Sequence, residues 1–352
     1  MTELRWKLAG DRGGQGVFFS DDELVERHVG RGVYRGMEFL HVNASRIVNE
    51  LPNASRMPFR FTINAYRGCS HACVYCFARP THAYLGLNSG DDFDTKLVVK
   101  VNAVERLRAE LRAPRWRGDA IAMGTNTDPY QRCEARYHLT RGLIEVLTEA
   151  ANPFSILTKS TLILRDIALL RAAAERTTVR ANLSVATLDE AVWKATEPGT
   201  PHPRRRVEAV AKLNAAGVPC GVLIAPVLPG LSDRRDQLTE VVEACVAARA
   251  VSITAVPLHL RPGVRDHFLS WLAGARPELV EDYRRRYRRA YLPGREQDDV
   301  TSLVRRLVAA ARRRHPRPDS RPRVAPPRGA DRAGSCGQAS LAPPARQLDL
   351  GV

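Results

Sequence analysis

The stretch Tyr66-Arg67-Gly68-Cys69-Ser70-His71-Ala72-Cys73-Val74-Tyr75-Cys76-Phe77-Ala78-Arg79-Pro80 contains three cysteines in the spacing C-x3-C-x2-C. Three soft thiolates on one loop can hold three irons of a cubane iron–sulfur cluster. The fourth iron then lacks a protein ligand, and such an open position can bind a chelating substrate or cofactor. We therefore expect Cys69, Cys73 and Cys76 to be metal ligands, and the tight turn before Cys69 to need Gly68.

Zinc is the alternative metal for this loop, because Cys3His sites are common and His71 or His82 could be the fourth ligand. Structural zinc modules usually pair two short cysteine hooks, however, and the chain has no second one. A third interpretation is that the three cysteines are unrelated core residues.

Around this loop, short β-type runs alternate with helical patterns from about Phe59 to Leu272. About six strand–helix units predict an α/β fold with a parallel sheet, as an incomplete (β/α)6 TIM-type barrel whose site lies at the carboxyl ends of the strands. A helix through Leu238 is expected to begin with Ser232-Asp233 as its N-cap. The expected strands are Phe61–Tyr66, Ala120–Gly124, Phe154–Thr158, Val179–Val185, Cys220–Ala225 and Ser252–Pro257.

The chain divides into four expected segments: a loosely structured N-terminal extension (1–55), a partial-barrel core (56–275), a C-terminal helical segment (276–311) and a disordered basic Pro/Arg-rich tail (312–352). In the helical segment, a helix over roughly Pro277–Tyr291 spaces three tyrosines four residues apart. This stripe fits a docking face against the rest of the protein better than a base-stacking surface. Cys336, in the tail, is expected to be an inert thiol.

Composition favours a cytoplasmic protein with no membrane segment. The 352 residues are 44% apolar, but no run approaches the 18–20 apolar residues of a membrane helix, and the N-terminus lacks the apolar stretch of a signal peptide. Seven unevenly spaced cysteines do not suit a disulfide framework. The net charge of +16 is compatible with binding a nucleic acid, or with an arginine-rich composition that raises the charge everywhere.

The cysteine loop, with an aromatic residue before its last cysteine, resembles the signature of the radical S-adenosylmethionine superfamily. The resemblance covers roughly residues 37–270 and favours the spore-photoproduct-lyase-like branch, which includes Rv2578c-like proteins. It rests also on Ser55-Arg56-Met57-Pro58-Phe59, Gly124-Thr125-Asn126-Thr127-Asp128-Pro129-Tyr130-Gln131 and Ala225-Pro226-Val227-Leu228-Pro229-Gly230-Leu231-Ser232-Asp233.

That resemblance implies a [4Fe-4S] cluster on Cys69, Cys73 and Cys76, S-adenosyl-L-methionine as cofactor, and an electron donor of flavodoxin or ferredoxin type. One electron would then cleave the cofactor to a 5′-deoxyadenosyl radical that abstracts hydrogen from a substrate, and cofactors of this kind carry the radical chemistry themselves.

The same resemblance suggests cofactor contacts. Oxygens of Gly124, Thr125 and Asn126 could accept hydrogen bonds from the methionine ammonium, although an ordinary turn capping the next helix is an alternative. Further contacts are expected from Tyr75 in the loop, from Asn182 and Ser184 on one face of a strand, and from the end of another strand at Ala225. A nearby ion pair or hydrogen-bond network would explain Asn182 and Ser184 equally well.

Three other features are less determined. Lys159 is a candidate partner for a carboxylate by its position at a strand end. The run Arg204–Arg206, after Glu197, is either an anion-binding group or a solvated charge run. Cys133 is a weak candidate for a catalytic hydrogen donor, whereas Cys220 and Cys245 suit the core.

Two classes of function follow. The first is a radical enzyme, a lyase or another radical-dependent modifying enzyme, acting on DNA or RNA or, as the runner-up, on a peptide or small molecule. The second is a non-catalytic, metal- or cluster-containing nucleic-acid-binding protein. The missing second metal hook and the Thr125-Asn126 loop favour the enzyme.

Overall fold

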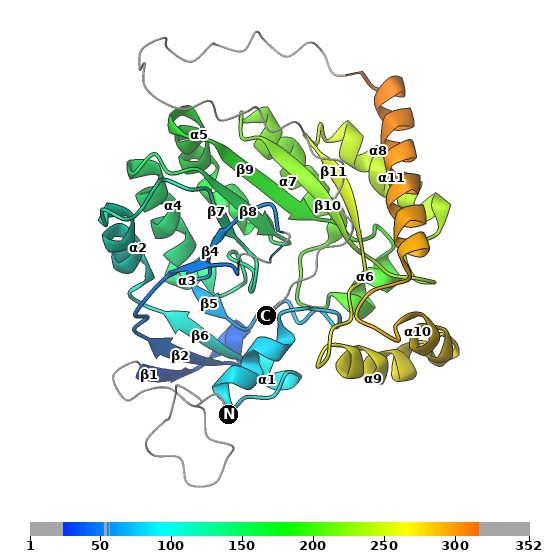
Figure 1. Cartoon of the computed structure of the whole chain (residues 1–352), viewed down its shortest axis with the longest axis horizontal. Coiled ribbons are helices and arrows are strands. Elements are labelled where there is room, and N and C mark those ends of the chain that lie inside the picture. The colour runs from blue at the N-terminus through cyan, green and yellow to red at the C-terminus, as the bar shows by residue number, and fades with distance from the viewer. Residues whose placement is uncertain (1–23, 53–54, 56, 317–352) are drawn as a thin grey trace.

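The main sheet confirms the expected α/β class and its six parallel strands. In the computed structural model, which describes residues 24–52, 55 and 57–316, this sheet has the order β11-β10-β9-β8-β7-β4-β3 (Figure 1). Only the short edge strand β3 is antiparallel to its neighbour. The strands are β3 (Val48–Glu50), β4 (Phe61–Ile63), β7 (Ile121–Met123), β8 (Phe154–Thr158), β9 (Val179–Ser184), β10 (Cys220–Val227) and β11 (Ile253–Pro257).

Amphipathic helices follow the strands and bury their apolar faces against the sheet. In α4, for example, Leu143, Ile144 and Leu147 recur at helical spacing and belong to the main core. The longest helix, α11, packs against α8 and β11 at one end of the sheet. The covering helices are α2 (Ala103–Arg112), α4 (Leu139–Glu149), α5 (Ile167–Arg176), α7 (Pro203–Ala215), α8 (Arg235–Ala247) and α11 (Gly294–Arg314). The others are α1 (Asp91–Thr95), α3 (Glu134–Tyr137), α6 (Glu190–Thr196), α9 (Arg265–Ala275) and α10 (Val280–Arg286).

A second, four-stranded sheet corrects two expectations. Its order is β1 (Leu24–Val29), β2 (Glu38–Val42), β6 (Lys96–Lys100) and β5 (Tyr66–Arg67). The expected loosely structured extension therefore contains strands, and its pattern is weak because β2 is completed by the sequence-distant β6. The expected strand Phe61–Tyr66 is two strands in different sheets. The chain leaves the main sheet at Asn64, whose side chain bonds the segment after β7.

Helix α8 begins later than expected. Its N-cap is Arg234, with no side-chain capping bond, so the expectation for Ser232-Asp233 is wrong. These two residues instead close the preceding turn, because Ser232 Oγ accepts a bond from the Leu228 N–H (2.9 Å) and Asp233 Oδ1 one from the Gly230 N–H (2.9 Å).

The C-terminal segment packs its tyrosines inward. The expected helix Pro277–Tyr291 is shorter, since α10 ends at Arg286. Tyr283 and Tyr287 are buried and stacked, and their hydroxyls donate to the carbonyls of Pro229 (2.7 Å) and Leu258 (3.2 Å). The stripe is a docking face within the protein. Helix α11 continues past Arg312, while the rest of the expected tail, from residue 317 and including Cys336, lies outside the described residues.

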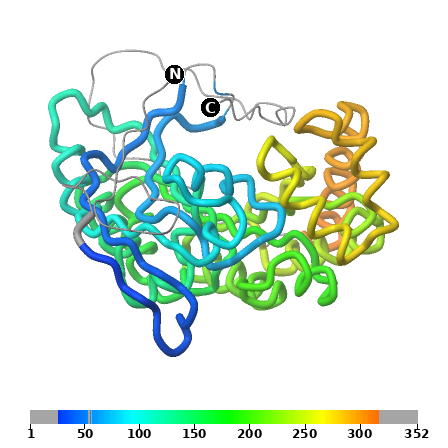
Figure 2. The backbone as a smooth tube through the Cα atoms, turned by 90° about the horizontal axis from the view of Figure 1, so that it is seen from below, coloured from blue at the N-terminus to red at the C-terminus, as the bar shows by residue number. Residues whose placement is uncertain are grey.

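Seen from below, the N-terminal strands and the C-terminal helices lie on opposite sides of the molecule, with the light-blue to cyan segment between them (Figure 2). That segment contains the three cysteines. None of the helices in the described ranges combines the length and the apolar character that crossing a bilayer requires.

Candidate functional site

The cysteine loop begins directly after β5 and buries its thiols. Cys69 and Cys73 are 6% and 7% exposed, Cys76 is partly buried, and none of the three forms a disulfide. Burial raises the pKa of each thiol, and the neighbouring thiols raise the pKa of Cys69 and Cys73 further. Three adjacent buried thiols are stable as thiolates only beside positive charge, which a metal cluster supplies.

Arg79 fixes the turn between the second and third cysteines. Its guanidinium donates from Nε and Nη2 to the Cys73 carbonyl (3.1 and 3.0 Å), and Nη2 also contacts the Asp94 carboxylate (2.9 Å). The side chain is 1% exposed and lies 5.2 Å from the ring centroid of Phe93. A buried arginine so fully bonded positions the backbone that carries Cys73 and Cys76.

The segment after β7 holds the start of the loop. Thr127 Oγ1 and Gln131 Nε2 donate to the Gly68 carbonyl (2.6 and 3.1 Å), and Gln131 Oε1 accepts from the Ser70 N–H (2.9 Å). Gly68 itself has φ +78°, and a Cβ there would lie 2.9 Å from the Phe93 carbonyl oxygen. The positive φ of Gly68 and the nearby Phe93 carbonyl both require glycine before the first cysteine, as the sequence predicted.

A buried contact between a histidine and a carboxylate links the loop to two strand ends. His71 Nδ1 lies 3.4 Å from the carboxylate of Asp128, which also accepts bonds from Thr158 Oγ1 (2.6 Å) and the Lys159 N–H (2.7 Å). Burial raises the pKa of Asp128, but His71 and these bonds outweigh it and lower the pKa overall. The segments after β7 and β8 are thereby tied to the middle of the loop.

The zinc alternative finds little support in this geometry. His71 is paired with Asp128, and His82 Nε2 lies 2.9 Å from the Lys96 carbonyl. Both histidines that could serve as a fourth zinc ligand are therefore engaged elsewhere.

On the opposite side, a buried charge pair that the sequence did not reveal supports the loop. Glu197 accepts bonds from the hydroxyl of Tyr75 and from Arg206 Nη2, which also donates to Thr200 Oγ1 (2.6 Å). Burial raises the pKa of Glu197, yet Arg206 and Lys159 lower it overall. Arg206 is fully buried, so it is neither a solvated residue nor an anion-binding one. Its neighbour Arg204 pairs with Glu240 at the surface.

The cofactor contacts expected from Gly124, Thr125 and Asn126 lie directly after the carboxyl end of β7, as predicted. Gly124 has φ +88°, and a Cβ would lie 2.0 Å from the Leu157 carbonyl oxygen, so only glycine fits. Asn64 Nδ2 donates to Thr125 Oγ1 (3.3 Å), and Asn64 Oδ1 accepts from the Asn126 N–H (3.1 Å). The side chains of Thr125 and Asn126 remain partly exposed.

Of the contacts expected on β9 and β10, Ser184 lies at the carboxyl end of β9, and its hydroxyl is already engaged. Ser184 Oγ donates to the carbonyl of Ala225 (2.8 Å), so it joins the two strands. Asn182 is half-buried in the middle of β9. The Lys159 ammonium lies 5.7 Å from the ring centroid of Tyr75 and lowers the otherwise raised pKa of Cys73, so it faces the cysteine loop.

Arg261, after β11, was not singled out from the sequence. It is half-buried, its Nε has no hydrogen-bond partner in the described part of the chain, and burial lowers its pKa while Tyr84 and Cys76 raise it. The sequence alone does not show that Arg261, which follows the last strand, interacts electrostatically with Cys76. That relationship depends on the order of the strands in the sheet.

The remaining cysteines of the described ranges lie in the main core. Cys133 is 1% exposed and packs there, and burial raises the pKa of its thiol. This packing favours a core role over that of a hydrogen donor. Cys220 and Cys245 are fully buried in the same core, as expected.

Comparison with known families gives a match to the radical SAM superfamily over residues 63–242. The chain is 47% identical over 280 residues to the uncharacterized protein Rv2578c of Mycobacterium tuberculosis, which covers 79% of this chain and 82% of that protein. It is 28% identical over 199 residues to protein MJ0683 of Methanocaldococcus jannaschii, covering 56% of this chain and 70% of the relative.

Among solved structures, the fold resembles spore photoproduct lyase. One such structure aligns with TM-score 0.55 and 18% identity over 77% of this chain and 78% of that one. Spore photoproduct lyase complexed with dinucleoside spore photoproduct aligns with TM-score 0.54 and 17% identity, over 79% and 80%. A form with bound AdoMet and the same dinucleoside aligns with TM-score 0.52 and 17% identity, over 75% and 76%.

Proposed function

Because the chain belongs to the radical SAM superfamily, we propose that Cys69, Cys73 and Cys76 bind a [4Fe-4S] cluster that also binds S-adenosylmethionine. When bound, these groups supply reductive cleavage of the cofactor to a 5′-deoxyadenosyl radical, which takes hydrogen from a substrate. The observation that carries the proposal is the cysteine loop, whose three free thiols, two buried and one partly buried, are held in place by Gln131, Asp128 and Glu197.

The residues of the chain have distinct roles in this proposal. Arg79, Gln131 and the Glu197–Arg206 pair hold the loop so that the thiols need little rearrangement on binding iron. Lys159 is the proposed partner for the carboxylate of the methionine. Thr125 and Asn126, whose side chains are partly exposed, are the proposed acceptors for its ammonium.

Further roles are proposed around the rest of the cofactor. Tyr75, whose ring centroid lies 5.7 Å from the Lys159 ammonium, and Asn182 and Ala225, on the paired strands β9 and β10, are the proposed contacts for its adenosyl part. Gly124 is required by its backbone conformation.

For the substrate we favour a nucleic acid. The net charge is +16, and the structural neighbours include spore photoproduct lyase bound to a dinucleoside photoproduct. Arg261 is a cation whose charge interacts with Cys76 and whose Nε has no hydrogen-bond partner among the described residues, and it would suit a phosphate of such a substrate. Electrons would come from a flavodoxin- or ferredoxin-type donor, for which dithionite substitutes in vitro.

Anaerobic reconstitution with iron and sulfide tests the cluster. We expect a brown protein with about four irons per chain that releases 5′-deoxyadenosine from S-adenosylmethionine when dithionite is added. Cys73→Ala should lose both colour and cleavage, whereas the core variant Cys245→Ala should keep both. A colourless protein loaded with zinc, or full activity in Cys73→Ala, would show that the proposal is wrong.

The substrate class has its own test. Single-stranded and duplex DNA, each with and without ultraviolet irradiation, and RNA would be added to the reconstituted enzyme, with a deuterated substrate to follow hydrogen transfer. We expect one nucleic acid to speed 5′-deoxyadenosine release and to transfer deuterium to it. If none does while cleavage itself proceeds, the enzyme stands and its substrate belongs to another class.

A further inference from the structure

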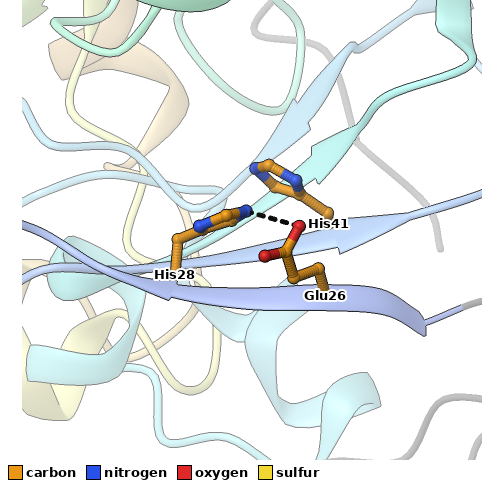
Figure 3. Close-up of side chains that lie close together, drawn as sticks. All are labelled: Glu26, His28 and His41. Carbon is orange, nitrogen blue, oxygen red and sulfur yellow. Dashed lines mark ion pairs between the residues drawn. The ribbon is translucent and has the colours of Figure 1, made fainter.

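Two histidines and a glutamate converge on the small sheet (Figure 3). Glu26 and His28 lie on β1, two residues apart, and His41 lies on β2. In the antiparallel pairing of these strands, Glu26 is opposite His41. Residues two apart on a strand share a face, and directly opposed residues meet across it. The register therefore brings all three side chains to one place.

Their distances fit a common ligand. One ligand atom from each of Glu26, His28 and His41 lies within 4.8 Å of the other two, and His28 Nε2 is 2.9 Å from the Glu26 carboxylate. Around tetrahedral zinc, nitrogen and oxygen ligands would be about 3.3 Å apart. Glu26 and His28 are 59% and 42% exposed on an edge strand. A small rotation of these side chains would shorten the distances between the ligand atoms to those found around zinc.

A simple ion pair does not account for the group. The Glu26–His28 pair is exposed, so it contributes little to stability, and it leaves His41 unexplained. The rings of His28 and His41 lie 4.3 Å apart at 50°, a close approach that disfavours two protonated imidazoles.

His41, the third residue of the group, is also within hydrogen-bond distance of Tyr137. His41 Nε2 is 2.7 Å from the hydroxyl of Tyr137, on α3, which leaves Nδ1 for a ligand. Metal-binding histidines almost always engage their second nitrogen in this way, which fixes the ring. Helix α3 follows Gln131, the residue that holds Gly68. An ion here would tie the β1–β2 hairpin to the body of the protein.

We propose that Glu26, His28 and His41 form a binding site for one divalent transition-metal ion of the zinc type, with solvent completing its coordination. Two imidazoles and one carboxylate favour such an ion over Mg²⁺ or Ca²⁺, which require mainly oxygen ligands. The site is separate from the cysteine loop, and an ion bound there would hold the β1–β2 hairpin in place.

The test uses the full-length, tag-free protein with its iron–sulfur cluster reconstituted under anaerobic conditions, so that the three cysteines are occupied. After incubation with ZnCl₂ and desalting, zinc and iron are measured per chain, and a chromophoric chelator competes for the zinc. We expect one tightly held zinc in addition to the iron, and a zinc-dependent rise in Tm.

Glu26→Gln and His28→Gln should each weaken zinc binding at least about 100-fold and abolish the zinc-dependent rise in Tm. Tyr137→Phe should weaken it about 10-fold, as loss of an outer-shell partner does. His315→Gln, at an exposed histidine paired with Glu243, is the matched control and should bind zinc as the wild type does. A wild-type protein that retains no zinc, or zinc binding unchanged in both Glu26→Gln and His28→Gln, would refute the site whatever the cluster does.

Discussion

The backbone N–H of Gly199 donates a hydrogen bond to the carbonyl oxygen of His71 at 3.0 Å, so a loop after α6 rests directly on the cysteine loop. The backbone of Gly199 lies close to the backbone of both Ser70 and His71. A Cβ at Gly199 would lie 2.1 Å from the Ser70 carbonyl oxygen and 2.9 Å from the backbone of His71. The absence of a side chain at Gly199 thus determines where the middle of the cysteine loop lies.

Gly199→Ala should therefore displace the cysteine loop and lower the iron content of the reconstituted protein severalfold. The clash is with backbone atoms that cannot rotate away, so the loop or the segment around Gly199 must move. The helical Gly274→Ala is the matched control, because nothing lies within 4 Å of its Cβ position. Iron analysis and cluster absorbance measure the effect, and equal iron in both variants would contradict it.

Glu197→Gln should destabilise the protein by about 3–5 kcal/mol, since it leaves the fully buried Arg206 without its counter-charge. The surface variant Glu240→Gln removes the partner of the exposed Arg204 and should cost less than about 1 kcal/mol. Denaturant unfolding measures both. The double variant Glu197→Gln/Arg206→Met should recover part of the loss. If Glu197→Gln and Glu240→Gln are equally stable, the buried pair does not support the loop as inferred.

Gly199 and the Glu197–Arg206 pair both support the cysteine loop, and neither role can be predicted from local sequence patterns. The order of strands and helices followed from local periodicity, and the cysteine loop was found because its spacing lies within one short segment. The Glu197–Arg206 pair was missed because the same letters, an arginine run after a charged turn, also describe a solvated surface. Only the fold shows that Arg206 turns inward while Arg204 turns outward.

The small sheet was missed for a related reason. Strand β2 is hydrogen-bonded to β6, more than fifty residues later, and a two-residue strand such as β5 carries no periodic signal. The expectation for Ser232-Asp233 failed because residues that cap helices also close turns, and both environments satisfy the same side-chain oxygens.

Lys159→Gln should raise the KM for S-adenosylmethionine about 10- to 100-fold and leave the iron content unchanged. This range corresponds to the loss of one charge-assisted hydrogen bond to the methionine carboxylate. Lys194→Gln, at an exposed lysine paired with Glu190 on α6, is the control. Steady-state release of 5′-deoxyadenosine gives the KM. A fall in kcat and in iron with no change in KM would mean that Lys159 supports the cluster instead.

Arg261→Gln should weaken binding of the nucleic acid that stimulates the enzyme, without lowering cleavage of S-adenosylmethionine in its absence. The reason is that the Arg261 Nε has no partner within the described residues, so little internal structure depends on it. Binding curves at two salt concentrations separate a phosphate contact from other effects, because loss of one such contact reduces the salt dependence by about one ion. Unchanged binding and salt dependence would remove Arg261 from the substrate site.

His82 should make the protein less stable in mild acid. Burial lowers the pKa of its imidazole to about 4, against about 6.5 in the unfolded chain, and its ring packs on Phe93. The stabilising contribution of the neutral ring is complete above pH 6.5 and is lost as the pH falls towards 4, by up to about 3 kcal/mol. The variant His82→Gln can still donate a hydrogen bond to the Lys96 carbonyl but does not titrate.

Between pH 7.5 and pH 5, the free energy of unfolding of the wild type should therefore fall relative to that of His82→Gln. His267, whose pKa burial also lowers to about 4, and Asp94, whose pKa burial raises to about 6, are present in both proteins and cancel in this difference. A difference that stays constant over that range would show that His82 is protonated equally in the folded and unfolded states.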